Sequence, residues 1–173
     1  MASWELRIAR TAEQTRGDRR RTVGTYQVFH DGVRVAGLSG ACAESPGPGD
    51  NSKAGNKRCI ETGTYPISTQ DGDKYCTIGY TSNLNPAAIR RPALLLRETN
   101  KRTDILLHPA RGFLWSVGCI NPSKPLPSAT SNIDFEDSRK RVIDIINDLK
   151  AFLGREFPGK NGRPIPNATI VIS

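Results

Sequence analysis

Residues 105–120 read ILLHPARGFLWSVGCI, and this stretch says more about the fold than any other part of the chain. The three apolar residues before His108 indicate the end of a buried strand, and the Pro-Ala-Arg-Gly run at 109–112 indicates a turn. Cys119 follows His108 after 11 residues, in a chain that has only two histidines and four cysteines. A strand end followed by a turn can bring the imidazole and the thiol face to face at the edge of a sheet. An imidazole in that position can hold a thiol as its reactive thiolate.

On both sides of this stretch the chain reads mostly as strands separated by turns. Residues 93–98 and 104–107 flank a polar run at 99–103, which predicts a hairpin. Asp31-Gly32, between two apolar runs, predicts another hairpin. The remaining expectations are strands at 4–8, 63–68, 74–80 and 168–172, a basic loop at 16–21 and a long surface loop at 39–58.

One helix is expected, over about residues 134–153. Its apolar residues recur at three- and four-residue steps, which predicts one buried face. Polar residues at 131–134 can cap its start, and Gly154 can end it. A chain of 173 residues is long enough for one domain with a real core. We therefore expect a single, mainly β domain over residues 1–173, a β-sandwich or sheet against which one long helix packs.

The chain is strongly basic. Its formal net charge is +8 and its sequence pI is about 9.6, which suggests an anionic partner such as nucleic acid, a cell-wall polymer or a membrane surface. The basic residues are dispersed apart from 16–21, and no nucleic-acid-binding motif is present, so no nucleic-acid partner is expected. No apolar run is long enough to span a bilayer, so no membrane anchor is expected. The first residues show no secretory signal, which predicts synthesis in the cytoplasm.

The cysteines favour neither a metal nor a cofactor. None of them forms a C-x-x-C pair, and two histidines cannot complete a usual zinc pattern, so we expect no metal site and no cofactor. A disulfide among Cys42, Cys59 and Cys76 is open in an oxidising compartment, and the sequence does not choose the pair. Cys119 is then the candidate for chemistry.

A cysteine nucleophile needs a base, donors that stabilise an oxyanion, and access for the substrate. His108 is the candidate base, because His30 lies beside the turn at Asp31 and is expected at the surface. Gly118 lets the backbone bend and a carbonyl approach, so the backbone N–H groups of Gly118 and Cys119 are the candidate oxyanion donors. The third catalytic group is Ser116 or a backbone carbonyl that orients His108. The alternative is a buried structural thiol beside a hydrogen-bonded histidine.

These residues resemble a known family. His108 after an apolar strand, followed by Ser116-x-Gly118-Cys119 and an apolar residue, resembles the active-site signature of the L,D-transpeptidase (YkuD-like) catalytic fold. Residues 61–65, Glu-Thr-Gly-Thr-Tyr, resemble the Thr-Pro-x-Gly-x-Tyr segment upstream of that site, with Glu in place of Pro. The resemblance covers about residues 58–121.

The chain also departs from the family pattern. The gap between His108 and Cys119 is shorter than in many members and is similar to that of compact relatives, which include antibacterial effectors delivered by type VI secretion. Asn121 stands where many members have an arginine that handles the substrate, and Val117 stands where His or Lys is common. These differences leave the acyl acceptor open.

What the resemblance implies is chemistry on peptidoglycan stem peptides. Cys119 would attack the carbonyl of meso-diaminopimelate at its bond to the terminal D-alanine, and a thioacyl enzyme would form. An amine would then give a crosslink or an exchange, whereas water would give carboxypeptidase action. The compact relatives further imply an antibacterial toxin that acts in the periplasm or cell wall and has an immunity protein as partner. The residues expected to contact substrate are Tyr65, Arg111, Trp115 and Asn121.

Three other interpretations compete. The first is a non-catalytic cell-wall-binding module on the same fold, in which Cys119 is disulfide-bonded or buried. The second is a basic nucleic-acid-binding protein, which a salt-dependent gel shift would test. The third is a papain-like amidase, which the order of the two residues disfavours, because such enzymes place the cysteine before the histidine.

Overall fold

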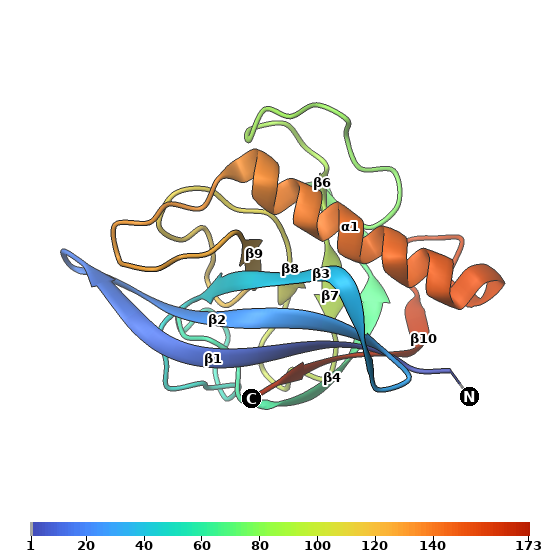
Figure 1. Cartoon of the computed structure of the whole chain (residues 1–173), viewed down its shortest axis with the longest axis horizontal. Coiled ribbons are helices and arrows are strands. Elements are labelled where there is room, and N and C mark those ends of the chain that lie inside the picture. The colour runs from blue at the N-terminus through green and yellow to red at the C-terminus, as the bar shows by residue number, and fades with distance from the viewer. Residues whose placement is uncertain (1) are drawn as a thin grey trace.

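Most of the chain builds one long, strongly curved sheet, and one long helix packs beside it (Figure 1). The computed structural model describes residues 2–173. This architecture confirms the expected mainly β fold with one long packed helix. The strands are β1 (Trp4–Arg16), β2 (Arg19–His30), β3 (Val33–Glu44), β4 (Gly63–Thr69), β5 (Tyr75–Cys76), β6 (Arg91–Pro92), β7 (Leu94–Leu96), β8 (Leu106–Leu107), β9 (Asn121–Ser123) and β10 (Pro164–Ile172).

The main sheet has eight strands in the order β8-β7-β4-β10-β1-β2-β3-β9. β10 is last in sequence but lies in the middle, parallel to β1 and antiparallel to β4. The first and last strands of the chain therefore lie side by side in the centre of the sheet. β5 and β6 form a separate parallel pair.

The two edges of the main sheet meet. Leu107 in β8 forms a parallel bridge with Ile120, the residue just before β9. The Ile120 N–H donates to the Leu106 carbonyl over 2.8 Å, and the His108 N–H donates to the Ile120 carbonyl over 3.0 Å. We call this junction the seam. It nearly closes the sheet on itself, and it lies between His108 and Cys119.

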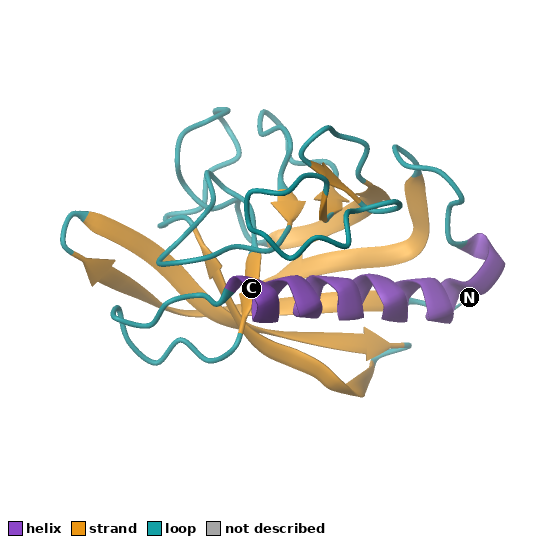
Figure 2. Ribbon diagram, turned by 90° about the horizontal axis from the view of Figure 1, so that it is seen from above, coloured by secondary structure: helices purple, strands orange, loops and turns teal. Residues whose placement is uncertain are grey.

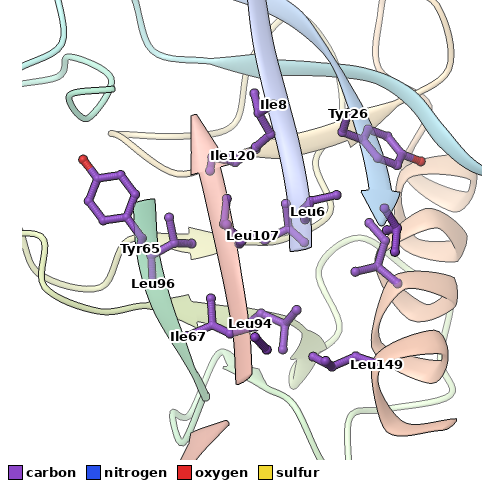
Figure 3. Close-up of a cluster of buried hydrophobic side chains, with 14 of the residues drawn as sticks. Leu6, Ile8, Tyr26, Tyr65, Ile67, Leu94, Leu96, Leu107, Ile120 and Leu149 are labelled. Atoms are coloured by element: carbon purple, nitrogen blue, oxygen red, sulfur yellow. The ribbon is translucent and has the colours of Figure 1, made fainter. Parts of the chain in front are cut away.

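The core fills the inside of the curved sheet. Leu6, Ile67, Leu107 and Ile170 are fully buried and come from strands that are far apart in sequence, and Leu149 joins them from the helix. Figure 3 shows Leu107 and Leu149 within this cluster. Each such side chain stabilises the fold by roughly 1.5–3 kcal/mol relative to exposure. The chain that leads into the seam is therefore anchored in the best-packed part of the molecule.

The helix α1 (Phe135–Leu153) agrees with its sequence pattern. A carboxylate oxygen of Asp134 accepts the Asp137 N–H over 2.9 Å at its start, and Gly154 ends it with an N–H that donates to the Lys150 carbonyl. A short 3₁₀ turn, η1 (Gly154–Glu156), follows. Figure 2 shows α1 lying along the sheet. Its buried apolar face consists of Phe135, Val142, Ile145, Ile146 and Leu149.

The loop prediction for residues 16–21 is wrong. β1 and β2 continue through this segment, and only residues 17–18 form the turn. The cause is Arg21, which is fully buried and donates to the carbonyls of Phe113 and Ser131 over 2.7 and 2.9 Å. Burial, together with the neighbouring arginines, lowers the pKa of Arg21 to about 10. The hydrogen bonds of this buried guanidinium thus hold the hairpin together in a segment whose charged residues had suggested an exposed loop.

Other boundaries also differ from the expectations. The loop expected at 39–58 begins only after β3, because residues 39–44 still pair with β2. The strand expected at 74–80 is reduced to two residues, and the last strand begins earlier than expected. The hairpins at Asp31-Gly32 and at 99–103 and the strand at 63–68 are confirmed.

The cysteines form no crosslink. All four thiols are free, so no disulfide joins Cys42, Cys59 and Cys76. Each of these three side chains is at most 1% exposed. Within residues 2–173, no helix has both the length and the apolar character that a membrane crossing requires.

Candidate active site

The seam brings His108 and Cys119 to one cavity. His108 directly follows β8, and Cys119 directly precedes the bridged Ile120, so each of them lies one residue away from the same parallel bridge. The cavity has a volume of about 370 Å³, and we call it the first cavity. It is lined by residues 70–75, Asp104, Leu106, His108 and Cys119.

His108 is held as a neutral base. It is 4% exposed, and its Nδ1 lies 2.7 Å from the Pro109 carbonyl oxygen. A carbonyl only accepts, so Nδ1 carries the proton and Nε2 keeps a lone pair. Within residues 2–173 no hydrogen bond occupies Nε2. Burial lowers the pKa of His108 to about 4, although its bond to Pro109 acts in the opposite direction.

Cys119 is a protonated thiol at neutral pH. Its Sγ accepts the Leu106 N–H over 3.3 Å and donates to the Asp104 carbonyl over 3.4 Å. Burial raises the pKa of the thiol to about 11. This shift disfavours a resting thiolate, because the charge of Arg102 does not offset the loss of water around the sulfur. Chemistry at Cys119 requires the thiol to leave Asp104 and pass its proton to a base.

Ser116 braces the loop that carries Cys119. Its hydroxyl donates to the Cys119 carbonyl over 2.8 Å and accepts the Gly118 N–H over 3.0 Å. Two roles are open to Ser116 from the sequence, a hydrogen bond within the loop or orientation of His108. The structure shows the first, and Ser116 makes no hydrogen bond to His108. The other predicted possibility, a backbone carbonyl, agrees with the contact to Pro109.

One of the two expected oxyanion donors is already in use. The Gly118 N–H donates to Ser116, whereas in the described part of the chain the Cys119 N–H has no acceptor. The Cys119 N–H is thus the group that can bind an oxyanion as the structure stands. Gly118 has a φ of +132°, and a Cβ at this position would overlap Nη2 of Arg102. The glycine therefore serves close packing behind the cysteine.

Arg102 is a residue that the sequence motifs missed. It is 3% exposed and donates to the carbonyls of Asp50, Arg58 and Val117 over 2.8, 2.9 and 3.0 Å. It thereby ties the loop at 45–62 to the residues just before Cys119. Its partners are backbone carbonyls far away in sequence, so no spacing rule could have found it.

A second cavity also reaches Cys119. It has a volume of about 260 Å³, and we call it the second cavity. Asp104 and Cys119 line both cavities, whereas His108 lines only the first. Cys119 therefore borders two separate cavities. The remaining lining residues of the second cavity are Gly55, Arg102, Thr103, Ile105 and Val117.

Two of the predicted substrate contacts are structural instead. Tyr65 is 4% exposed, and its hydroxyl donates to the Glu61 carbonyl over 2.6 Å. Asn121 is fully buried, and its Nδ2 donates to the His108 carbonyl over 3.2 Å. Neither residue lines the first or the second cavity. The Oδ1 of Asn121 is buried and has no hydrogen-bond partner among the described residues. Asn121 therefore positions His108 rather than touching a ligand.

The other two predicted contacts lie near the site but not on its cavities. The ring of Trp115 packs under two guanidinium groups, with Arg91 at 5.0 Å and Arg111 at 5.8 Å from its centroid. Neither Arg111 nor Trp115 lines the first or the second cavity. Their contact with substrate stays a prediction.

Tyr75 was also missed by the sequence motifs. Its ring centroid lies 4.6 Å from that of His108, with the planes tilted by 42°. Arg91 covers the same tyrosine at 4.6 Å. The only sequence signal was the turn at 71–72 that precedes it, and this signal says nothing of a partner more than 30 residues away.

Comparisons with family models, with curated proteins and with solved structures gave no match. The resemblance to the L,D-transpeptidase-like fold therefore stays a resemblance of short motifs. Any chemistry assigned to the chain depends on the geometry around Cys119 and His108.

Proposed function

We propose that this protein is a cysteine-dependent enzyme that modifies peptidoglycan stem peptides by acyl transfer through a thioacyl enzyme at Cys119. One observation carries the proposal: the buried His108, whose Nε2 has no hydrogen-bond partner among the described residues, and Cys119 line the same cavity. A base and a nucleophile with a shared substrate space are what such chemistry needs.

The reaction follows from the charge states. Sγ attacks the substrate carbonyl carbon as its proton moves to Nε2 of His108, and the Cys119 N–H stabilises the oxyanion. The C–N bond then breaks, and Nε2 returns the proton to the departing amine, which leaves a thioacyl enzyme. An incoming amine or water reverses these steps: it gives a proton to Nε2, attacks the carbonyl carbon and releases Sγ as the thiol.

The two cavities suit the two halves of the substrate. Groups that exchange a proton with Nε2 must lie in the first cavity, because His108 lines only that one. We therefore place the leaving amine and the incoming acceptor in the first cavity, and the acyl chain in the second. Cys119, at the junction, reaches the carbonyl between them.

The stem-peptide substrate is supported by the motif around His108 and Cys119 and by the net charge of +8, which suits an anionic wall polymer. Such a substrate places the site of action in the periplasm or cell wall. The short motif gap further supports a role as a delivered antibacterial effector with an immunity protein. Directing the protein to the periplasm of a Gram-negative host would test this role, with growth arrest expected for the wild type and not for Cys119→Ala.

The decisive experiment is mass spectrometry of muropeptides after incubation with wild type, Cys119→Ala and His108→Gln. Loss of the terminal D-alanine, or its exchange for an added amine, is expected only with the wild type. His30→Gln is the matched control, because His30 bonds Asp148 on α1 and is no part of either cavity. Unchanged muropeptides with the reduced wild-type protein would overturn the proposal.

A non-catalytic wall-binding module is the second candidate, and the raised pKa of Cys119 favours it. Under this alternative, wild type and Cys119→Ala bind sedimented peptidoglycan equally and leave its mass unchanged. Trapping a thioacyl adduct on Cys119 by intact-protein mass spectrometry would exclude it.

A further inference from the structure

The first cavity has an acidic entrance on a basic protein. Asp71, Asp73 and Asp104 line it, against the single ammonium of Lys74. We call the three aspartates the acidic mouth. All three are exposed, and within residues 2–173 none of their carboxylates takes part in an ion pair or a side-chain hydrogen bond. Three unpaired carboxylates around one space favour a cationic occupant.

A second observation points to a polar ligand in the same space. His108 is 4% exposed and lines this cavity, and its Nε2 has no hydrogen-bond partner among the described residues. With Nδ1 protonated, the lone pair of Nε2 is free to accept a hydrogen from a ligand such as an amine. A ligand that reaches His108 through this cavity shares the space with the acidic mouth.

We propose that the first cavity is an acceptor-amine subsite, and that the acidic mouth selects cationic primary amines with no carboxylate beside the amine. This inference rests on the proposed acyl transfer. It also predicts how the thioacyl enzyme reacts. An amine that is concentrated in the first cavity competes with water for the thioester carbon, which favours aminolysis over hydrolysis. A zwitterionic amino acid binds little better there than in solution, because the aspartates attract its ammonium group but repel its carboxylate. The same repulsion favours departure of the D-alanine released in the first step.

The transfer step balances without a further reactant. The ammonium loses one proton to solvent, and the neutral nitrogen attacks the thioester carbon. The C–N bond forms and the C–S bond breaks, while a second amine proton passes through Nε2 to Sγ and restores the thiol. The aspartates form no bond in this step. They raise the local concentration of the amine.

The first test measures how the thioacyl enzyme partitions between aminolysis and hydrolysis. Tetrapeptide muropeptides are incubated with deuterated D-alaninamide, which has no carboxylate, or with deuterated D-alanine, each at equal free-amine concentration. The label distinguishes the D-alanine exchange product from the unreacted tetrapeptide by mass. For the wild type we expect a higher aminolysis ratio with the amide. In Asp71→Asn/Asp73→Asn this preference should fall by about threefold to tenfold, as expected for two partly screened charges. Equal ratios for both amines, or an unchanged preference in the variant, would overturn the inference.

The matched control is Asp18→Asn/Glu156→Gln, which removes the same charge from exposed positions outside both cavities. It should keep the wild-type preference. A loss of preference in the control as well would show an effect of net charge and count against the acidic mouth.

The second test does not need turnover. The alkylation rate of Cys119 is compared for 2-bromoethylammonium, iodoacetamide and iodoacetate, with site assignment by peptide mass spectrometry. Each rate is divided by the rate of the same reagent with a free thiol. We expect the normalised rate to be highest for the cationic reagent, lower for the neutral one and lowest for the anionic one. The differences between the three rates should be smaller in Asp71→Asn/Asp73→Asn and at high salt. Charge selectivity without any thioacyl enzyme would support the acidic mouth while the acyl-transfer proposal fails. A thioacyl enzyme with no charge selectivity in either test would overturn the acidic mouth alone.

Discussion

The imidazole of His108 is neutral and the thiol of Cys119 is protonated near pH 7, because burial moves the two pKa values apart, to about 4 and about 11. The pair is therefore a general base beside its proton donor rather than an ion pair. The active form gains a proton on His108 below about pH 4 and loses one from Cys119 above about pH 11. We expect kcat/KM for acylation to stay level from about pH 5 to 10. A rise through pH 6–7 in the measured profile would instead point to an imidazolium–thiolate pair.

Gly118 is the residue at which we expect a single added methyl group to destabilise the fold most. Its φ of +132° disfavours any side chain, and the added Cβ would overlap the Arg102 guanidinium. We expect Gly118→Ala to lower the free energy of unfolding by about 2–4 kcal/mol in urea titrations. Gly112→Ala is the control, because Gly112 has a φ of +73° with open space around it. If Gly112→Ala also lowers the free energy of unfolding by more than about 1 kcal/mol, the effect at Gly118 would be assigned to backbone strain and not to the overlap with Arg102.

At the scale of elements, Arg102 links two loops that the strands leave unconnected. Its three bonds to backbone carbonyls need the fork of a guanidinium, which lysine does not have. We expect Arg102→Lys to cost about 2–4 kcal/mol of unfolding free energy, because buried carbonyls lose their donors. Arg97→Lys, at an exposed position of the same hairpin, should be neutral in the same urea titration. Equal midpoints for both variants would show that the loops are held by other contacts.

The elements that local sequence patterns could predict are the ones that local forces determine. The helix, its glycine stop and the turn at Asp31-Gly32 depend on residues a few positions apart, and these are confirmed. The length of the first hairpin depends on Arg21 and its distant carbonyl partners, and the sequence missed it. The position of β10 in the middle of the sheet also comes from long-range pairing.

The site shows the same division. The short separation of His108 and Cys119 in the sequence suggested a shared site, but the parallel bridge between Leu107 and Ile120 is what brings them to one cavity. The acidic mouth, Tyr75 and Arg102 could not be predicted, since they reach the site from segments that only the closed sheet brings together.

At the scale of the whole molecule, the buried His108 couples stability to acid. Its folded pKa of about 4 lies below its ordinary value, so between about pH 6.5 and 4 the unfolded chain binds a proton that the native protein does not. Stability therefore rises with pH in this window and falls on acidification. We expect the free energy of unfolding to drop by about 2–3 kcal/mol from pH 7 to 4.5. His108→Gln should lose most of this pH dependence, and an unchanged slope in the variant would assign it to other groups.

The seam has a consequence for the thermal inactivation of the protein. The reactive pair lies where the curved sheet meets itself, and two backbone hydrogen bonds between 106–108 and 120 join that junction. Cys119 adds two side-chain hydrogen bonds, with Leu106 and Asp104, and Asn121 adds one with His108. This small set of bonds opens by local breathing at a lower cost than melting of the packed interior. His108 and Cys119 would separate with each opening, while the core around Leu107 stays intact. Thermal inactivation should therefore precede global unfolding, and brief cooling should restore a protein that never lost its overall shape.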